Sequence, residues 1–449
     1  MNKPSIHFHS GASAVTGAFF TFHISGKVIA IDCGSLQGTD ELENKNTLDF
    51  PIDPAGIDVL VITHAHADHI GRVPKLVADG FTGPIYSTRP TKQIAKVMFD
   101  DVIRIISRNN RRDPLFSRQD VEQTMSQWKE IPYHYPVSVS DDLSFTLHNA
   151  GHILGSSMVK FKSEVGNVLF TGDLGNGPDQ LLPDCEELSD IDFMVIESVY
   201  GDREHEARED RIRKLEQVIE DTIRVGGTLL IPTFALERSQ NLLFSLNELT
   251  EKKRIPHISV FFDSPLASGL TQIFRDSSEY FKREVRNRLV SDPDVFSFPG
   301  LVETISRNDS KSILQAPKPK IVIASAGMSV GGRILFHEAQ YLDEVDTIIL
   351  FIGYQAVGTV GRMIQDGVNR VSLLGRGVDV RAQVITIQGF SAHADRTGLL
   401  DFIAPCKHSL KKVFCVMGDD ESSNALATGI RDKYALDAYT PSDGSVEYL

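Results

Sequence analysis

Cysteine is scarce in this sequence, which has four among 449 residues, and no two of them form a C-x-x-C pair. The sequence therefore predicts no disulfide framework, and a reducing, cytoplasmic setting fits it best. No apolar run approaches the roughly 20 residues that span a bilayer, and Met1–Ser5 lacks the charged-then-apolar order of a signal peptide. We therefore expect a cytoplasmic protein with no membrane partner.

Basic charge is also in deficit. Lysine and arginine number 46 against 60 aspartates and glutamates, and the net charge of −14 argues against a broad, non-specific hold on nucleic acid. This charge does not exclude a local basic groove, although the arginines between residues 104 and 112 fit a solvated helix face better. The apolar content of 41% is typical of a soluble globular protein, and the length favours two domains.

Metal-ligand residue types are concentrated in one stretch that follows an apolar run, Thr63-His64-Ala65-His66-Ala67-Asp68-His69. In an extended segment His64 and His66 point the same way, because side chains alternate between two faces. The helical spacing of the apolar residues that follow predicts a turn, which brings Asp68 and His69 beside the first pair. Imidazole and carboxylate together suit zinc or a similar borderline metal. Separately satisfied surface histidines are the alternative, and they explain this density poorly.

The same order of strand and ligand recurs along the first half of the chain. Short apolar runs end in turns that carry a carboxylate or an imidazole, as at the carboxyl ends of strands in α/β proteins. The runs and their following residues are Val28–Ile31 with Asp32, Val59–Ile62 with the histidine cluster, Asn167–Phe170 with Asp173, and Phe193–Ile196 with Glu197. Because these strands do not alternate strictly with helices, we expect a sandwich of sheets with helices outside.

His152 lies in a glycine-flanked turn, where a lone histidine would usually be structural. Asp173 follows at the end of the next strand, and the two residues together supply what a two-metal site needs. These are separate nitrogen ligands and one carboxylate able to bridge. His148 lies within a strand-like run, and we expect it to be an ordinary residue.

From about residue 201 strands and helices alternate, which predicts a parallel sheet and a second α/β domain. The tail returns to the strand-then-ligand order of the first half. We therefore predict a first domain made of residues 1–200 and 383–449, with residues 201–382 inserted between its parts. Within the insertion, Gly331-Gly332-Arg333 opens a predicted helix and could hold a phosphate, although glycine-rich turns are often only turns.

In this order the motifs resemble the beta-CASP family, metallo-beta-lactamase-fold nucleases related to RNase J and to the endonuclease of mRNA 3′-end processing. The resemblance spans nearly the whole chain, and it implies an αββα sandwich with an inserted beta-CASP α/β domain on a parallel sheet. The motifs that carry it are Asp32-Cys33-Gly34, the cluster from His64 to His69, Gly151-His152, Gly172-Asp173, Glu197-Ser198-Val199-Tyr200-Gly201, Gly331-Gly332-Arg333 and Phe390-Ser391-Ala392-His393-Ala394-Asp395.

The resemblance also implies a dinuclear zinc site in the cleft between the domains, with Mn²⁺ as a second candidate metal. One zinc would bind His64, His66 and His152, the second would bind Asp68 and His69, and Asp173 would bridge both. Asp32 would support these ligands from behind. The catalytic residues would be Asp68, Glu197 and His393, with the last two facing each other across the cleft. The substrate-binding residues would be Gly331, Gly332, Arg333 and Ser391.

Met417 departs from the family pattern, which has a metal-binding histidine at this position. A thioether is soft and neutral, and it is a poor substitute for imidazole on zinc. Asp419 or Asp420 could reach in, or water could fill the position. We therefore expect a weakened second zinc site.

The leading hypothesis is hydrolysis of RNA phosphodiester bonds, in RNA processing or decay, on single-stranded RNA. Asp68 would take a proton from the attacking water, and His393, tuned by Glu197, would protonate the departing 3′ oxygen. The alternative is a catalytically impaired RNA-binding or scaffolding homologue, motivated by Met417. A small-molecule hydrolase would explain the histidine cluster but not the inserted domain. The sequence does not decide whether RNA or DNA is preferred, or whether the cleavage is endo- or exonucleolytic. It also leaves open the natural target and whether the protein forms a homo-oligomer.

Overall fold

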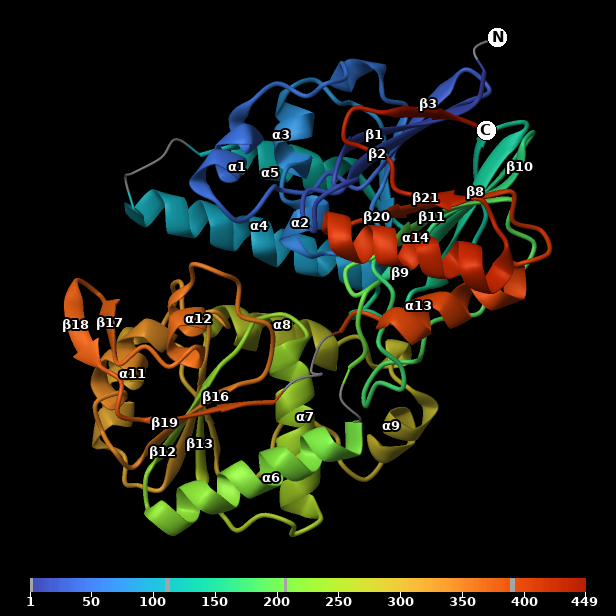
Figure 1. Ribbon diagram of the computed structural model, residues 1–449. Coiled ribbons are helices and arrows are strands. Elements are labelled where there is room, and N and C mark those ends of the chain that lie inside the picture. Colours follow the sequence, from blue (N-terminus) through green and yellow to red (C-terminus); the bar gives the residue numbers. More distant parts are fainter. Residues whose placement is uncertain (1–2, 110–113, 206–207, 388–391) are drawn as a thin grey trace. The chain divides into compact units, whose positions relative to one another are not determined.

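The computed structural model describes residues 3–109, 114–205, 208–387 and 392–449. Contacts divide the chain into two compact units. The first joins residues 1–204 to 393–449, and the second is the continuous segment 205–392. In Figure 1 the blue, teal and red ribbons belong to the first unit, and most of the yellow and orange ribbons belong to the second. No helix in the described ranges is both long and apolar enough to cross a bilayer.

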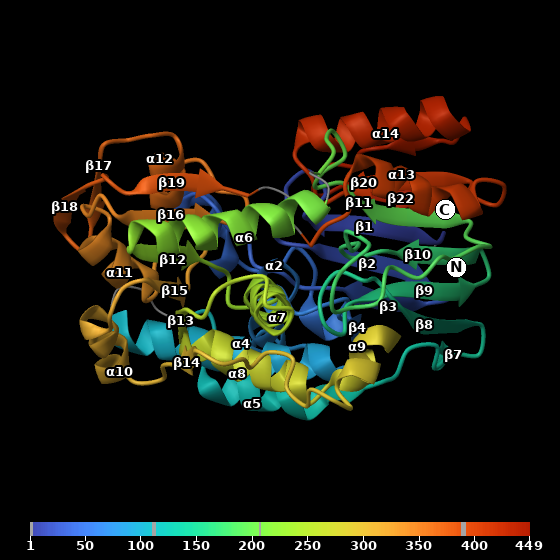
Figure 2. The same ribbon diagram turned by 90° about the horizontal axis from the view of Figure 1, so that it is seen from below.

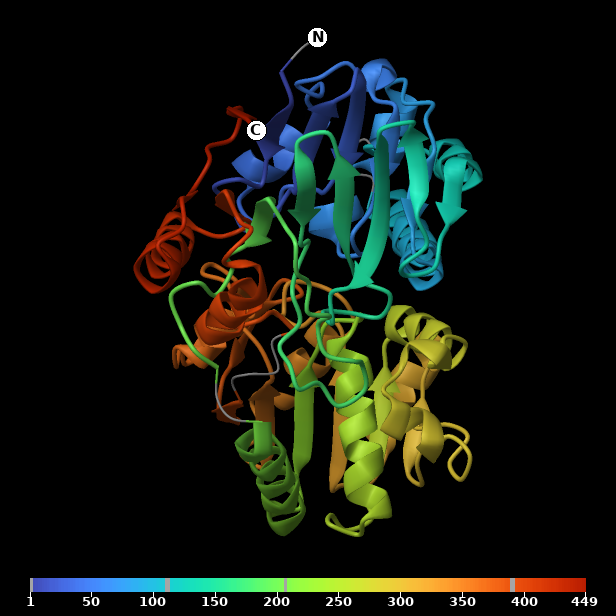
Figure 3. The same cartoon turned by 90° about the vertical axis from the view of Figure 1, so that its right-hand side faces the viewer.

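Two seven-stranded sheets form the first unit, and Figure 3 shows the teal strands of one in front of the blue strands of the other. In spatial order the first sheet contains β22 (Val446–Tyr448), β1 (Ser5–Ser10), β2 (Phe19–Ile24), β3 (Lys27–Ile31), β4 (Val59–Val61), β5 (Ile85–Ser87) and β6 (Trp128–Glu130). The second contains β21 (Ala438–Tyr439), β20 (Lys412–Val416), β11 (Phe193–Glu197), β10 (Gly166–Phe170), β9 (Ser157–Ser163), β8 (Leu143–Asn149) and β7 (Val137–Ser140). Neighbouring strands in each sheet are joined by backbone hydrogen bonds.

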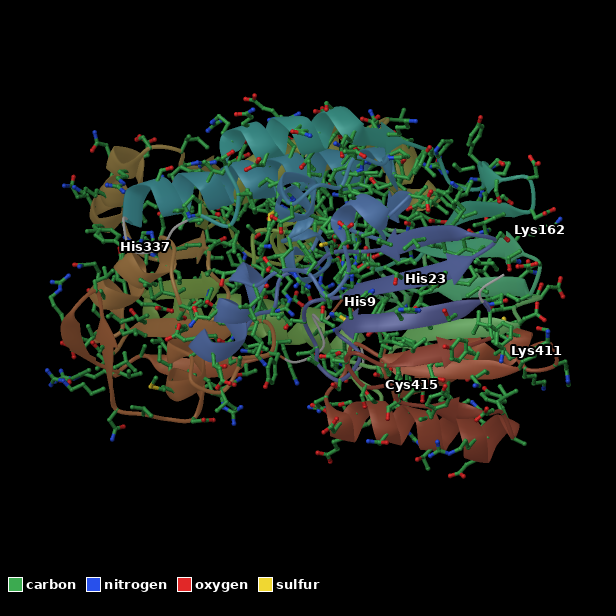
Figure 4. All side chains as sticks on the ribbon, turned by 90° about the horizontal axis from the view of Figure 1, so that it is seen from above. His9, His23, Lys162, His337, Lys411 and Cys415 are labelled. Carbon is green, nitrogen blue, oxygen red and sulfur yellow. The ribbon has the colours of Figure 1, made fainter. Side chains whose placement is uncertain are left out.

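Alternation along the strands builds the core between these sheets. On β2, Phe20 and Phe22 are buried in the shared core, where the ring of Phe22 meets that of Phe161 on β9 edge to face with centroids 5.4 Å apart. The opposite face carries His9 of β1 and His23 of β2, both labelled in Figure 4. This period of two is what a sheet with one buried face requires.

Helices cover the outer faces of this sandwich. Leucines and isoleucines of α13 (Arg396–Ile403) and α14 (Asp420–Tyr434) pack with residues of β11 and β20 in a second apolar cluster. The other helices of the unit are α1 (Asp40–Asn44), α2 (Ala67–Ile70), α3 (Val73–Ala78), α4 (Arg89–Asn109) and α5 (Arg118–Gln127). Among these, α3 and α4 contact α5, and α4 also contacts β6.

The second unit contains a six-stranded, entirely parallel sheet with helices on its faces, as Figure 2 shows. In spatial order its strands are β14 (Leu301–Glu303), β13 (Ser259–Asp263), β15 (Lys320–Ala324), β12 (Thr228–Pro232), β16 (Thr347–Phe351) and β19 (Gln383–Thr386), and β17 (Arg370–Leu373) pairs separately with β18 (Arg376–Asp379). Its helices are α6 (Arg208–Val225), α7 (Arg238–Glu251), α8 (Pro265–Arg275), α9 (Arg283–Arg288), α10 (Arg307–Ser312), α11 (Ile334–Tyr341) and α12 (Val360–Gln365). Residues of α11 and α12 pack on one face of the sheet in a common apolar cluster.

The predicted fold class is confirmed, with a two-sheet sandwich interrupted by an α/β unit on a parallel sheet. One strand differs from the prediction. We expected the tail of the first domain to begin at residue 383, but β19 pairs in parallel with β16 and completes the sheet of the second unit. In the sequence, this strand is followed by glycine and ligand residue types like those after the strands of the first half, and this local likeness hid its parallel partner.

Candidate metal centre

The histidine cluster is shaped by the segment that follows β3. The backbone N–H of Cys33 donates to the carbonyl of His69 at 2.8 Å, and that of Ala18 donates to the carbonyl of Asp68 at 2.9 Å. Gly34 lies so close to this turn that a Cβ on it would be 1.5 Å from the Asp68 carbonyl oxygen. Only glycine allows such an approach. These hydrogen bonds and the close approach of Gly34 therefore fix the predicted turn. Helix α2 already begins at Ala67, whereas the helix was expected to begin after His69.

Three imidazoles converge through one ring nitrogen each. The Nδ1 atom of His66 lies 3.1 Å from Nε2 of His64 and 3.2 Å from Nε2 of His152. His64 and His152 are buried, and His66 is partly exposed. Two imidazole nitrogens that bind one tetrahedral zinc at roughly 2.0–2.1 Å lie about 3.3 Å apart. The spacing of the three nitrogens therefore fits a shared metal ion.

Asp173 faces this group with one oxygen and His69 with the other. Its Oδ2 lies 3.4 Å from Nε2 of His64 and 3.5 Å from Nε2 of His152, and its Oδ1 lies 3.3 Å from Nε2 of His69. Oδ1 of Asp173 and Nε2 of His69 are buried without a hydrogen-bond partner. Buried polar atoms are nearly always paired, so these two atoms point to a bound cation. The donor set fits the divalent metals that imidazole and carboxylate prefer.

Asp32 organises the histidines from behind. Its carboxylate accepts hydrogen bonds from the Thr63 N–H at 2.8 Å, the Thr63 hydroxyl at 2.7 Å and Nδ1 of His69 at 2.7 Å. The Thr63 oxygen also lies 3.1 Å from Nδ1 of His64. Because the hydroxyl proton goes to Asp32, the Thr63 oxygen is left to accept from His64 Nδ1–H. These contacts engage Nδ1 of both histidines and leave Nε2, which faces Asp173, as the atom that would bind a metal ion.

Burial and charge set the protonation states of the group. Burial lowers the pKa of His64, and it lowers the pKa values of His66 and His152 well below the ordinary value, so these rings stay neutral. Burial alone would raise the pKa of Asp173, but His69, His393 and His64 hold it well below its usual range. Burial would lower the pKa of His69, but Asp173 and Asp32 raise it well above the ordinary value, so this ring would have to release a proton to bind a metal ion. The three neutral imidazoles and the ionised carboxylate are already in the states in which these groups bind metal.

Glu197 and His393 form a hydrogen-bonded pair next to Asp173. Nδ1 of His393 lies 3.2 Å from Oε2 of Glu197 and 3.8 Å from Oδ2 of Asp173. Glu197 is the last residue of β11, and its Oε1 accepts the N–H of Leu174 at 2.6 Å. Both residues belong to the first unit, in agreement with the predicted domain bounds.

Burial raises the pKa of the Glu197 carboxyl. Burial would lower the pKa of His393, but Glu197 and Asp173 raise it to about 9. The pair therefore holds a proton on the imidazole at neutral pH.

The structure brings most of the predicted site residues together, but not all. The Asp68 residue is partly exposed, although burial of its carboxyl group raises the pKa of that group. Asp68 does not join the donor group of His64, His66, His152 and Asp173. Met417 is buried in the core between the two sheets, where a Cβ on Gly11 would lie 2.8 Å from its sulfur. Its side chain therefore packs as a hydrophobic residue.

In the second unit, Arg333 donates to the carboxylate of Asp263 and to the carbonyls of Thr304 and Ile305. The same carboxylate lies 2.7 Å from Nε2 of His337, which Figure 4 labels. Gly332 has a positive φ of 72°, and a Cβ there would lie 2.1 Å from the carbonyl oxygen of Ser325. These contacts give Arg333 and the glycine turn a part in holding the unit together. Ser391, predicted to bind substrate, lies outside the described residues.

The sequence analysis missed a further group of metal-ligand side chains. Among the described residues, His134, His148 and Glu186 also bring one ligand atom each within 4.8 Å of the others. The three are far apart in the sequence, and His148 was expected to be ordinary. Among local features, only the place of His148 on an outward face of a strand, two residues after Thr146, could have indicated a ligand.

Comparisons with known proteins agree with this architecture. Residues 22–199 match the metallo-beta-lactamase superfamily domain, residues 239–364 the Beta-Casp domain, and residues 377–441 the Zn-dependent metallo-hydrolase RNA specificity domain. Together the three matched segments cover most of the chain, in the order expected for an interrupted first domain.

Among curated proteins, the chain is 34% identical over 415 residues to ribonuclease TTHA0252 of Thermus thermophilus, which covers 92% of this chain and 93% of that protein. It is 32% identical over 399 residues to transcription termination factor FttA of Pyrococcus horikoshii, where it spans 61% of the relative's length. A crystal structure of a protein of unknown function from Enterococcus faecalis V583 aligns over 100% of both chains with a TM-score of 0.58 and 13% identity, which is a likeness of fold.

Proposed function

Because the chain belongs to the beta-CASP family of metallo-beta-lactamase-fold nucleases, a family of metal-dependent hydrolases, we propose that it hydrolyses RNA phosphodiester bonds at a dinuclear zinc centre. The placement of Asp173 carries the proposal. One of its carboxylate oxygens faces His64 and His152, and the other faces His69. A carboxylate shared in this way by two sets of nitrogen donors is suited to bridging two metal ions.

His64, His66 and His152 would hold one zinc ion, and Asp68 and His69 would hold the second. Zn²⁺ suits these ligands best, and Mn²⁺ is the next candidate. When bound, two such ions activate water as a nucleophile and neutralise charge on the phosphate. The second ion would bind more weakly, since the family's histidine is replaced by Met417.

His393 would donate the proton to the leaving group. Glu197 and Asp173 keep its pKa at about 9, so the ring carries a proton at neutral pH. Since Nδ1 is engaged by Glu197, Nε2 is the ring atom that would present a proton to the departing 3′ oxygen. Asp68 would accept a proton from the attacking water. These roles predict products with 5′-phosphate and 3′-hydroxyl ends.

Single-stranded RNA is the proposed partner. The match to an RNA specificity domain and the identity to a ribonuclease support RNA over a small molecule. We also propose a cytoplasmic setting, and Gly331, Gly332, Arg333 and Ser391 remain candidates for binding the substrate. The homo-oligomeric state stays a prediction to be measured.

The test is cleavage of an end-labelled single-stranded RNA with added zinc or manganese, beside DNA of the same sequence. Asp68→Ala and His393→Ala should each lower the cleavage rate by about 100-fold or more, while RNA binding is retained. His408→Ala, which changes an exposed histidine of the same unit, should cut like the parent protein. Unchanged cleavage in both site variants would refute the assignment.

An RNA-binding or scaffolding role is the second candidate, and the packing of Met417 in the apolar core favours it. The two candidates differ in metal content and in turnover. A scaffold should bind the RNA, hold little zinc at this centre and leave the RNA intact with either metal. Cutting that depends on zinc bound at this centre would exclude this role.

A further inference from the structure

A second group of metal-ligand side chains lies in the first unit and shares no residue with the centre described above. It consists of His134 in the connection from β6 to β7, His148 on β8, and Glu186 in the connection from β10 to β11. Nε2 of His134 lies 2.8 Å from Oε2 of Glu186, and Nδ1 of His148 lies 2.9 Å from Oε1 of the same carboxylate. The two rings are 5.1 Å apart at 63°.

Backbone hydrogen bonds to one strand hold all three residues in place. The N–H of His134 donates to the carbonyl of Leu147 at 2.8 Å, and the N–H of Glu186 donates to the carbonyl of Asn149 at 3.0 Å. His148 lies between these two acceptors on β8. The donor atoms are therefore set on a rigid element, which is the condition for a preorganised metal site.

The environment of His148 suits a ligand. Its Nε2 lies 2.9 Å from the hydroxyl oxygen of Thr146, a contact that fixes the ring and turns Nδ1 toward Glu186. Burial lowers the pKa of His148, so the ring is neutral at neutral pH. The His134 side chain is 61% exposed, which gives an ion and its water ligands access from solvent.

We propose that His134, His148 and Glu186 bind a divalent transition metal ion, with zinc the first choice. Two imidazoles and one carboxylate form a donor set that zinc uses with a water molecule in the remaining position. Hydrogen bonding alone, with Glu186 accepting from both rings, is the competing explanation for the same contacts. The experiment below separates the two.

This ion would fasten the connection that leads from Asp173 to β11. The segment beside Glu186 lies against the turn that carries His152, because a Cβ on Gly151 would be 2.5 Å from the N atom of Cys185. Cross-linking Glu186 to β8 would hold this segment against the turn. The ion is thus structural, and it supports the position of His152 from outside the donor group.

The test is a zinc titration of the metal-free full chain against a chromogenic chelator. The parent protein and His408→Ala should bind one equivalent more than His134→Ala and Glu186→Gln. His134 is exposed, so its variant should fold, and its own melting temperature without metal is the baseline for its zinc-dependent rise. Only the parent and His408→Ala should gain the part of the zinc-dependent rise in melting temperature that belongs to this ion. Equal stoichiometry in all four proteins would overturn the proposal and leave a hydrogen-bonded cluster only.

The site can also be tested apart from the proposed catalytic centre. Asp173→Ala removes the bridging carboxylate of that centre, and it should retain the equivalent bound by His134, His148 and Glu186. Adding His134→Ala to this variant should remove that equivalent. If Asp173→Ala and the double variant bind the same amount of zinc, the further site does not exist, whatever the nuclease activity proves to be.

Discussion

Replacing Asp32 by asparagine should disable the metal centre by moving protons rather than by removing a ligand. The carboxylate accepts three hydrogen bonds, from Thr63 N–H, the Thr63 hydroxyl and His69 Nδ1. Asparagine keeps the shape but replaces one oxygen by a donating NH₂ group. If this group takes the place of Oδ2, it faces His69 and the Thr63 hydroxyl, and both must then accept.

The consequence reaches both histidines. His69 would accept at Nδ1 and carry its proton on Nε2, the atom that faces Asp173. Once the Thr63 oxygen accepts from the amide, its hydroxyl can donate to Nδ1 of His64, which moves the proton of that ring to Nε2 as well. Each ring then presents N–H where metal binding needs a lone pair.

The magnitude should differ between stability and metal binding. Hydrogen bonds to a charged group contribute about 1.5–3 kcal/mol and neutral ones about 1, so the variant should lose roughly 1–3 kcal/mol of stability and still fold. Loss of an outer partner of a metal-binding histidine typically lowers metal affinity by about 10- to 100-fold. The affinity should therefore fall much more than the folded population does.

The assay is a competitive zinc titration of Asp32→Asn, with urea unfolding of the same samples without metal. Asp58→Asn is the matched control, because Asp58 also accepts from a backbone N–H, that of Val28 at 2.9 Å, but lies outside the donor groups of the centre. The control should bind zinc like the parent. Parental zinc affinity in Asp32→Asn would show that Asp32 does not set the histidine tautomers, and the reasoning would fail.

Three further predictions follow from individual contacts. Gly34→Ala should destabilise the fold by about 1–3 kcal/mol or more and abolish zinc binding, because its Cβ would collide with the Asp68 carbonyl, whereas Gly269→Ala, with open space around it in α8, should be neutral or stabilising in thermal unfolding. Burial raises the pKa of Glu338 from 4.5 to about 8, so the folded state retains a proton that the unfolded chain releases, and stability falls as pH rises from about 4.5 to 8. Glu338→Gln should remove this loss, with an advantage of a few kcal/mol, about 5 at most, in urea unfolding at pH 9 that vanishes at pH 4. Met417→His should raise the zinc content by up to one equivalent above the parent's, since histidine tolerates the positive φ of 53° at this position, and an unchanged zinc content would show that the side chain does not reach the centre.

The sequence predicted the parts of the fold that depend on residues close together in the chain. The run from Val59 to His69 combines an apolar strand, a turn and ligand residue types within a few positions, and the structure has β4, the turn and the start of α2 there. The family assignment is confirmed by the three matched domains. Pairing between distant strands is not local, and for that reason β19 was assigned to the wrong unit.

Side-chain partners across the fold were the harder part. Asp263, which engages Arg333 and His337, ends a strand far from both in sequence, and so these contacts could not be predicted. His134 and Glu186 meet only because each connection bonds to β8. Nothing within a few residues of either position signals this. Such groups form because the topology of the fold brings distant segments together, and a single sequence does not reveal this topology.

The interrupted order of the first unit has a consequence for synthesis on the ribosome. β20 lies between β11 and β21, and β22 pairs with β1, so strands from residues 393–449 complete both sheets. At roughly 5–20 residues per second, the intervening segment takes about 10 to 40 s to emerge. The second unit can fold during that interval while Glu197 waits for His393. A nascent chain thus lacks the pair of Glu197 and His393, and the last strands of both sheets, until residues 393–449 have emerged.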